Sequence, residues 1–286
     1  MLTLLDIVKR TTDFFTKHGI ESARLNAELI IAHALGMNRM KIYLQFERPL
    51  TESELEGIRP LVKRRAQREP LAYVLGTAPF GDLTLTVDKR VLVPRPETEQ
   101  LVEIIKDTLS ATPPARILDL GTGSGALALG LAKTFANAQV VAVDASEDAL
   151  TLARQNAATA QLESRVEFRH SNWFSALRSD ERFDLIVANP PYLTESEWTE
   201  AQPEVRDHEP KQALVASDAG CADLLTIIAN APRHLAPDGS LYLETGIDQH
   251  ARLLEAIAAA GLADGRSIQD WSERPRFVAA RAGRSG

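Results

Sequence analysis

The sequence predicts an α/β fold with a doubly wound, mostly parallel sheet, preceded by a small helical bundle. From residue 115 onward, short apolar runs that are typical of buried strands alternate with helical segments, and this alternation indicates a parallel sheet. Before residue 76 the apolar residues recur at helical spacing instead. The 286 residues suffice for one large domain and a smaller one, because single cores stop growing at about 250 to 300 residues.

Four helices are predicted in the N-terminal region, over residues 3–17, 22–35, 40–46 and 51–68. Thr51 followed by Glu54 has the pattern of a capping box, and Gly36 marks a helix end. These segments carry no catalytic pattern, so we predict that residues 1–75 form a helical domain for substrate recognition. The basic residues within 63–68 are interpreted as a solvated helix face, with a docking surface for an acidic or nucleic-acid partner as the alternative.

A β-hairpin is expected to connect this domain to the rest of the chain. Residues 80–87 alternate between apolar and polar side chains, residues 88–90 form the turn, and residues 91–93 return. We therefore assign residues 76–95 to a hairpin linker. Pro96 and Glu97 then begin a helix, because the first helical turn accepts proline and favours a carboxylate.

Residues 96–286 are predicted to form the larger domain around a seven-stranded sheet. The strands are expected at residues 116–120, 139–143, 166–168, 183–188 and 239–244, with two more within 266–280. Helices are expected at residues 126–135, 147–160, 222–235 and 249–260. Because open sheets of this kind bind ligands beyond the carboxyl ends of their strands, we expect the site in the loops that follow them.

Composition and charge exclude several classes of protein. The single Cys221 rules out an internal disulfide framework and suits a reducing compartment. No stretch reaches the roughly 20 apolar residues of a membrane span, and the N-terminus lacks the apolar core of a signal peptide, so we expect a cytoplasmic protein without membrane association. Residues 1–75 carry twelve basic and nine acidic residues, whereas the rest carries 20 and 30. The acidic larger domain argues against stable nucleic-acid binding.

A glycine loop, residues 119–125, lies between the first strand of the sheet and the next helix, where glycines let a ligand approach the backbone. Gly121, Gly123 and Ala126 also satisfy the dinucleotide fingerprint, so this motif alone leaves a nicotinamide enzyme open. Asp119 resembles the acidic start of the methyltransferase glycine loop and fits a zwitterionic amino acid better than a pyrophosphate. Asp144 ends the next strand, where a carboxylate accepts from both ribose hydroxyls.

The segment Asn189-Pro190-Pro191-Tyr192 directly follows the apolar strand 183–188. The prolines stiffen the loop and have no N–H, so it offers two acceptors, the Asn189 side-chain carbonyl and the Pro190 backbone carbonyl, beside the flat Tyr192 ring. This suits a planar NH2 group. The segment resembles the Asn/Asp-Pro-Pro-Tyr/Phe motif of methyltransferases that use S-adenosylmethionine to alkylate nitrogens conjugated to a π-system; a stiff structural turn is the alternative.

Five segments together resemble the glutamine N-methyltransferases that modify peptide chain release factors: residues 95–99, 119–125, 172–173, 189–192 and 204–210. The resemblance implies a Rossmann-like class I methyltransferase that uses S-adenosylmethionine and acts on the glutamine of the release factor's Gly-Gly-Gln tip, while the helical domain helps to hold this partner. We also expect a monomer without a metal site. The loop 95–99 is expected to border the cofactor.

The resemblance and the residue patterns together assign the candidate site residues. Catalysis is assigned to Asn189, Pro190 and Tyr192. Substrate binding is assigned to Asn189, Pro190, Pro191 and Tyr192. Cofactor binding is assigned to Asp119, Gly121, Thr122, Gly123, Ser124, Gly125, Asp144, Asn172, Trp173 and Asn189. No catalytic histidine is expected, since the alkylated amide loses its proton to water after methyl transfer.

Two departures from the family pattern concern the lid and the exact substrate. Residues 215–221 are less glycine-rich than expected, and Glu244-Thr245-Gly246 replaces the more usual Glu-Ile-Gly. The alternatives are a glutamine methyltransferase of a large-subunit ribosomal protein and a DNA methyltransferase for the exocyclic amine of adenine. A non-enzymatic module that retains a nucleotide-like pocket is the alternative from a different class.

Overall fold

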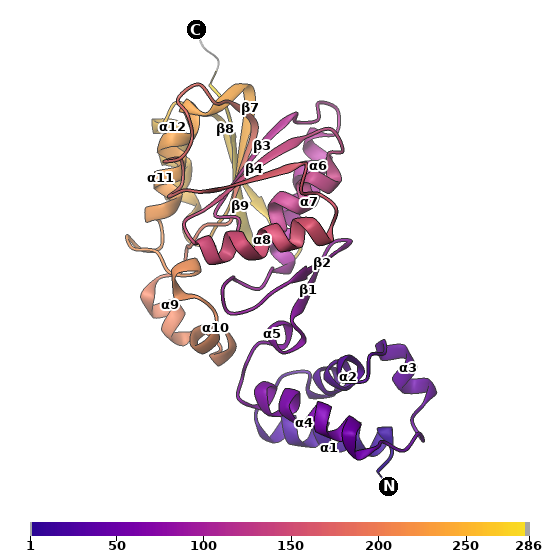
Figure 1. The fold of residues 1–286 in the computed structure, drawn as a ribbon. Coiled ribbons are helices and arrows are strands. Elements are labelled where there is room, and N and C mark those ends of the chain that lie inside the picture. Colours follow the sequence, from indigo (N-terminus) through magenta and orange to yellow (C-terminus); the bar gives the residue numbers. More distant parts are fainter. Residues whose placement is uncertain (1, 284–286) are drawn as a thin grey trace. The chain divides into compact units, whose positions relative to one another are not determined.

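The structure, a computed structural model, describes residues 2–283; residue 1 and residues 284–286 of the predicted larger domain lie outside the described part. The chain forms two compact units (Figure 1). One comprises Met1–Thr77 together with Gln202–His208, and the other comprises Ala78–Ala201 and Glu209–Gly286. This division differs from the predicted boundaries, because most of the proposed linker belongs to the larger unit and a short segment near residue 205 belongs to the smaller one.

The helical unit contains the four predicted helices: α1 (Leu4–Lys17), α2 (Ala23–Ala34), α3 (Arg39–Leu44) and α4 (Glu52–Ala66). Both α1 and α4 begin with capping boxes, and the one at Thr51 and Glu54 confirms the prediction. A fifth helix, α5 (Leu71–Leu75), is too short to show a periodic pattern in the sequence. The buried core of the helical unit includes Leu4, Ile31, Ile42 and Leu50.

The basic end of α4 is not simply a solvated face, so that interpretation was wrong. Arg65 is only 6% exposed, and Arg65 and Arg68 form ion pairs with Glu204 of α10 (Pro203–His208), at 2.9 and 2.6 Å. Arg64 pairs with Glu69 at 2.6 Å. Arg65 and Arg68 therefore hold residues 202–208 within the helical unit. Arg68 and Glu204 are 136 residues apart in the sequence, so the local charge pattern does not reveal this contact.

The predicted hairpin exists one strand earlier than expected. The strands are β1 (Thr77–Phe80) and β2 (Leu83–Thr86), joined by Gly81-Asp82, and residues 91–93 form no strand. Gly81 has a φ of 53°, which suits glycine at a tight turn. The Thr86 N–H donates to the Asn156 side chain at 2.7 Å and the Thr86 carbonyl accepts from it at 3.0 Å, so β2 is fastened to the helix Glu147–Thr159.

The larger unit is built on the predicted seven-stranded sheet, and the strand order is β5-β4-β3-β6-β7-β9-β8. The first five strands in this order are parallel, and β9 pairs antiparallel with both β7 and β8. The strands are β3 (Arg116–Leu120), β4 (Gln139–Asp144), β5 (Val166–His170), β6 (Phe183–Ala188), β7 (Leu235–Glu244), β8 (Ala263–Gln269) and β9 (Pro275–Arg281). The central strands β3 and β6 are almost entirely buried, as their apolar sequences indicate.

Helices cover both faces of this sheet. Figure 1 shows α11 (Ala222–Asn230) and α12 (His250–Ala259) on one side and α6 (Pro96–Leu109) and α7 (Ala126–Thr134) on the other. Helix α8 (Glu147–Thr159) connects β4 to β5. The loop after β6 contains α9 (Glu195–Glu200), α10 and η1 (Lys211–Ala213), none of which was predicted. No helix within residues 2–283 is both long and apolar enough to cross a membrane.

The predicted helix 222–235 is shorter than expected. It ends at Asn230, and the 3-10 turn η2 (Ala231–Arg233) follows before β7 begins at Leu235. Pro232 explains the difference, because proline has no N–H to continue the helix and its ring clashes with the preceding turn.

Candidate active site

The pairing register brings three loops of the larger unit to one edge of the sheet. Leu120 of β3 pairs with Val143 of β4 and with Ala188 of β6, so the residues that follow, Gly121, Asp144 and Asn189, lie at the same level. A cavity of about 450 Å³ opens here, a size typical of ligand pockets. Its lining includes the predicted residues Gly121, Thr122, Gly123, Ser124, Asp144, Asn172, Trp173, Asn189, Pro190 and Pro191.

The glycine loop needs its glycines for two physical reasons. Gly121, Gly123 and Gly125 have φ values of 73°, 55° and 85°, which L side chains rarely adopt. A Cβ on Gly121 would also lie 3.3 Å from the Trp173 ring. Asn156 donates to the Ser124 carbonyl at 2.9 Å and so anchors the loop from α8. Gly125 is buried at the start of α7 and does not line the cavity.

Asp119 lies behind the glycine loop and is completely buried. Its Oδ2 accepts hydrogen bonds from the Thr122 hydroxyl at 2.6 Å and the Ala128 N–H at 3.1 Å. Its Oδ1 has no hydrogen-bond partner among the described residues. Burial raises the pKa of this carboxyl to about 7. Asp119 does not itself line the cavity, so it shapes the loop and leaves one acceptor oxygen unused.

Asp144 ends β4 and lines the cavity, as predicted. One carboxylate oxygen accepts from the Gly123 N–H and the other from the Ser146 N–H, both at 2.8 Å. Burial raises the pKa of Asp144, and these backbone bonds oppose the rise. Each oxygen keeps lone pairs for further donors. The carboxylate therefore connects two cavity loops and remains able to accept from a ligand's hydroxyl groups.

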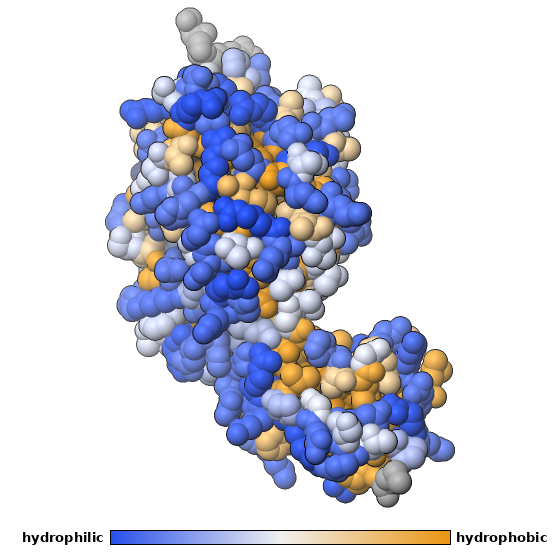
Figure 2. All heavy atoms as spheres, in the orientation of Figure 1, coloured by the Kyte–Doolittle hydropathy of each residue, from blue (hydrophilic) through white to orange (hydrophobic). Residues whose placement is uncertain are grey.

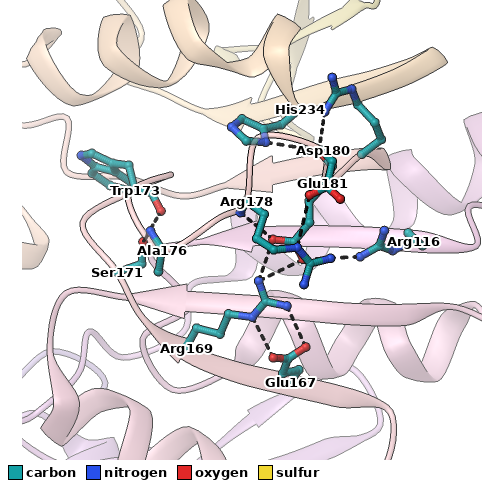
Figure 3. A network of polar contacts seen from close by, with 11 residues as sticks. Arg116, Glu167, Arg169, Ser171, Trp173, Ala176, Arg178, Asp180, Glu181 and His234 are labelled. Atoms are coloured by element: carbon teal, nitrogen blue, oxygen red, sulfur yellow. Dashed lines mark hydrogen bonds and ion pairs between the residues drawn. The ribbon is translucent and has the colours of Figure 1, made fainter.

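Trp173 is held in an unusual backbone conformation at the cavity wall, with a φ of 48°. Ser171 donates to the Trp173 carbonyl at 2.8 Å and accepts from the Ala176 N–H at 2.9 Å, which closes this turn (Figure 3). The indole N–H donates to Asp223 of α11 at 3.2 Å. Asp223 also lines the cavity and was not predicted, because nothing in its local sequence distinguishes it from an ordinary acid in a first helical turn.

The side chain of Asn189 is oriented by a chain of hydrogen bonds. Its Nδ2 donates to the Thr98 hydroxyl at 3.1 Å, and that hydroxyl donates to Oε2 of Glu244 at 2.7 Å. Thr98 and Glu244 are 4% and 1% exposed. Because the amide nitrogen is bound to Thr98, the side-chain carbonyl is left to accept from a ligand in the cavity that Asn189 lines.

Tyr192 lies behind the proline loop and not in the cavity lining. Its hydroxyl donates to Oε1 of Glu244 at 3.1 Å, and its backbone carbonyl accepts from Gln249 at 2.9 Å. Burial and the neighbouring Glu244 carboxyl raise the pKa of the phenol, so the hydroxyl stays protonated. The structure therefore gives Tyr192 an anchoring position for the loop, while its contact with a substrate stays a prediction.

An ion pair with one buried partner joins the cavity lining, and the sequence indicated only its arginine. Arg95, which precedes α6, lines the cavity and pairs with Glu209 at 2.5 Å. The Glu209 side chain is 1% exposed, and burial raises its pKa against the effect of Arg95. Arg95 and Thr98 thus place the loop 95–99 at the cavity, where the sequence analysis expected it.

Comparison with known proteins identifies the family. Residues 6–76 match the family described as the PrmC N-terminal domain, and residues 112–275 match the family described as a methyltransferase domain. The release factor glutamine methyltransferase of Geobacter sulfurreducens is 40% identical over 282 residues, which cover 98% of this chain and 97% of that protein. The chain belongs to the release factor glutamine methyltransferase family.

Other release factor glutamine methyltransferases give the same result. That of Chlorobaculum tepidum is 38% identical over 98% of this chain and 97% of its own length. The crystal structure of a methyltransferase from Pyrococcus furiosus aligns with a TM-score of 0.54 and 19% identity over 77% of this chain and 98% of that chain, which supports the fold. The family and its methyltransferase fold were both predicted from the sequence.

Two residues near the Asn189 amide, Thr98 and Glu244, were not among the predicted site residues. Both belong to segments that the sequence analysis noted, but neither has a recognisable local pattern. Ala188 pairs with Leu243, so Glu244 lies beside Asn189 at the end of the neighbouring strand. The sequence signal for Glu244 is a carboxylate at the end of the strand that follows the proline motif. This signal indicates a site residue once the pairing of β6 with β7 is known.

Proposed function

We propose that this protein transfers a methyl group from S-adenosylmethionine to the side-chain amide nitrogen of the glutamine in the Gly-Gly-Gln motif of class 1 peptide chain release factors. The name of its relatives supports the release factor as substrate. The observation that carries the proposal is the orientation of Asn189, whose Nδ2 bonds Thr98 at 3.1 Å and whose carbonyl is thereby left for the hydrogens of a planar NH2 group.

The cavity residues fit the proposed cofactor. The unused Oδ1 of Asp119, behind the glycine loop, suits a cationic amino group that is bound through a water, and Asp144 suits the two ribose hydroxyls. Trp173 offers a flat surface for the adenine, next to Asn172. The absence of a side chain at Gly121 leaves room for the Trp173 ring beside the loop. When bound, S-adenosylmethionine supplies a methyl group on a positively charged sulfur.

The protein's part in the reaction is to position a weak nucleophile. An amide nitrogen reacts poorly because its lone pair is delocalised into the carbonyl. Asn189 Oδ1 and the Pro190 carbonyl accept the two amide hydrogens, hold the nitrogen in line with the methyl group and stabilise positive charge as it builds on nitrogen. The rigid Pro190-Pro191 pair keeps both acceptors in place without a rearrangement during the reaction. The methylated amide then loses a proton to water.

The helical unit is proposed to recognise the release factor. Five of the seven large apolar residues that are exposed in the described structure lie in it: Phe14, Leu25, Met40, Tyr43 and Leu44. Figure 2 shows apolar atoms gathered on the helical unit beside hydrophilic ones. Exposed apolar groups of this kind are typical of protein-binding surfaces. The proposal places the reaction in the cytoplasm, where translation ends.

A methyl-transfer assay tests the proposal. The protein is incubated with radiolabelled S-adenosylmethionine and release factor, with the wild-type tip or with the tip glutamine replaced by alanine. Label is expected only in the wild-type tip. Asn189→Ala should cost about 2 to 4 kcal/mol of barrier, the scale of one lost transition-state contact, while cofactor affinity falls much less. Near-normal turnover in that variant would contradict the role of Asn189.

Parallel incubations separate the alternatives. Stronger labelling of a glutamine in a large-subunit ribosomal protein would favour that substrate instead. Tight duplex-DNA binding that weakens steeply with salt would favour an adenine methyltransferase. Binding of the cofactor with no transfer to any of these substrates would indicate a binding module without enzymatic activity.

A further inference from the structure

We propose that Glu244 and Thr98 are positioning residues that determine which end of the Asn189 amide faces the cavity. The inference rests on the proposed function, since the exposed carbonyl matters only if a ligand NH2 must be held. Neither residue is assigned a direct contact with the substrate or the cofactor. They act through Asn189, and Tyr192 is bound to the same carboxylate.

The hydrogens available to the three side chains fix the direction of the bonds. A threonine hydroxyl has one hydrogen, and Thr98 gives it to Oε2 of Glu244 at 2.7 Å. Its oxygen is then only an acceptor toward Asn189, so the Asn189 NH2 must face Thr98. An ionised Glu244 enforces this direction because it has no hydrogen to donate. Tyr192 uses the other oxygen, Oε1, at 3.1 Å. Each bond in the chain is thus donated in the direction of the buried carboxylate.

A neutral residue at position 244 removes this direction. Once protonated, Glu244 has a hydrogen that must go to one of its two hydroxyl neighbours. If Thr98 accepts it, the Thr98 hydrogen turns to Asn189 and favours the opposite amide orientation, with NH2 toward the cavity. Two donors would then face each other when the substrate amide enters. Only the charged carboxylate therefore fixes the Asn189 amide in the orientation that presents its carbonyl to the cavity.

The surroundings of Glu244 place this change close to neutral pH. The carboxyl is 1% exposed, and burial raises its pKa to about 6. Bonds from Thr98 of α6 and Tyr192 lower the pKa, as does the charge of Arg276 of β9, whereas Glu97 of α6 raises it. Turnover at saturating substrate and cofactor is therefore expected to rise with pH through about 6 and to level off above it.

The test compares three threonine variants. Thr98→Val keeps the shape of the side chain but removes both hydrogen bonds, and Thr98→Ser restores the hydroxyl. Thr108→Val makes the same change at an exposed position of the same helix and is the matched control. At about pH 8, Thr98→Val should lower kcat about tenfold, the value of roughly one net hydrogen bond, with cofactor Kd nearly unchanged. Thr98→Ser and Thr108→Val should stay within about twofold of the wild type.

The shape of the pH profile separates positioning from a merely structural role. Thr98→Val and Glu244→Gln should both lose the rise of kcat near pH 6, and Glu244→Gln should keep the low rate at every pH. Thermal unfolding of each variant identifies a general loss of structure. A Thr98→Val protein that is folded, binds cofactor and retains both the wild-type kcat and its acidic limb would overturn the inference.

A measurement without substrate keeps this inference separate from the proposed function. The side-chain amide signal of Asn189 in a ¹⁵N–¹H spectrum of the cofactor-bound protein should shift with pH near 6 in the wild type and stay constant in Thr98→Val. If the wild type methylates no release factor, the proposed function fails while this titration still reports on the orientation. If methylation occurs and the Asn189 signal does not titrate, the positioning role fails alone.

Discussion

Asp119, behind the glycine loop, offers a quantitative test of the site's electrostatics. Its carboxyl is completely buried, and burial raises its pKa from 3.8 to about 7. The folded state then binds this proton more tightly than the unfolded chain does, so stability falls as the pH rises from about 4 to about 7. Asp119→Asn cannot ionise and should remove this loss.

The magnitude follows from the two pKa values. Between about pH 5 and about pH 7 this group costs the wild type about 1.36 kcal/mol per pH unit, and little more above pH 7, which amounts to about 2.5 kcal/mol by pH 8. Any constant effect of the amide on packing cancels when two pH values are compared. Relative to the wild type, Asp119→Asn should therefore gain about 2.5 kcal/mol of unfolding free energy between pH 5 and pH 8.

Urea unfolding of the cofactor-free protein at both pH values measures this difference. Asp107→Asn, an exposed substitution on α6, is the control and should show no such gain. Calorimetric titration should find weaker S-adenosylmethionine binding to Asp119→Asn, by about 1 to 3 kcal/mol, because an NH2 replaces the unused acceptor. Identical pH dependence of stability in Asp119→Asn and the wild type would refute the account of a buried carboxyl that is costly to ionise.

Two further predictions concern stability and the proline loop. Glu181→Gln, which removes a buried charge from the ion pair with Arg169 at 2.9 Å (Figure 3), should cost about 3 kcal/mol in urea unfolding near pH 7, whereas Glu167→Gln at the exposed partner should cost under about 1. The pKa of Glu181 is lowered to about 2, so this cost should shrink as the pH falls below about 4.5; a cost that persists at low pH would contradict the ion-pair explanation. Gly220→Ala places a Cβ against the Tyr192 backbone carbonyl and should lower both the melting temperature and kcat. Gly261→Ala is the control, because Gly261 has a similar φ of 76° but open space around it. This control should lower the melting temperature only slightly and leave kcat unchanged.

Much of the fold follows from local sequence patterns. The apolar strands at 116–120 and 183–188 were located to the residue, because a central strand is buried on both faces and is therefore continuously apolar. The Thr51 capping box located the start of α4 in the same way. The weaker signals failed: residues 91–93 have strand composition but no partner strand, and Pro232 ends α11 early.

The candidate site divides between sequence and structure in the same way. The glycine loop, Asp144 and the proline motif were recognisable because their chemistry depends on residue types at fixed local spacing. Thr98, Glu244 and Glu209 have no such spacing, and Arg65 looked like part of a solvated charge run. Their roles depend on partners more than 100 residues away in the sequence, brought together by strand register and buried charge pairing. The sequence alone thus determined the family, the reaction class and the loops that form the cavity. The tertiary structure alone decided the orientation of the Asn189 amide, because the buried Glu244 carboxylate at the end of the hydrogen-bond chain sets the direction of its bonds.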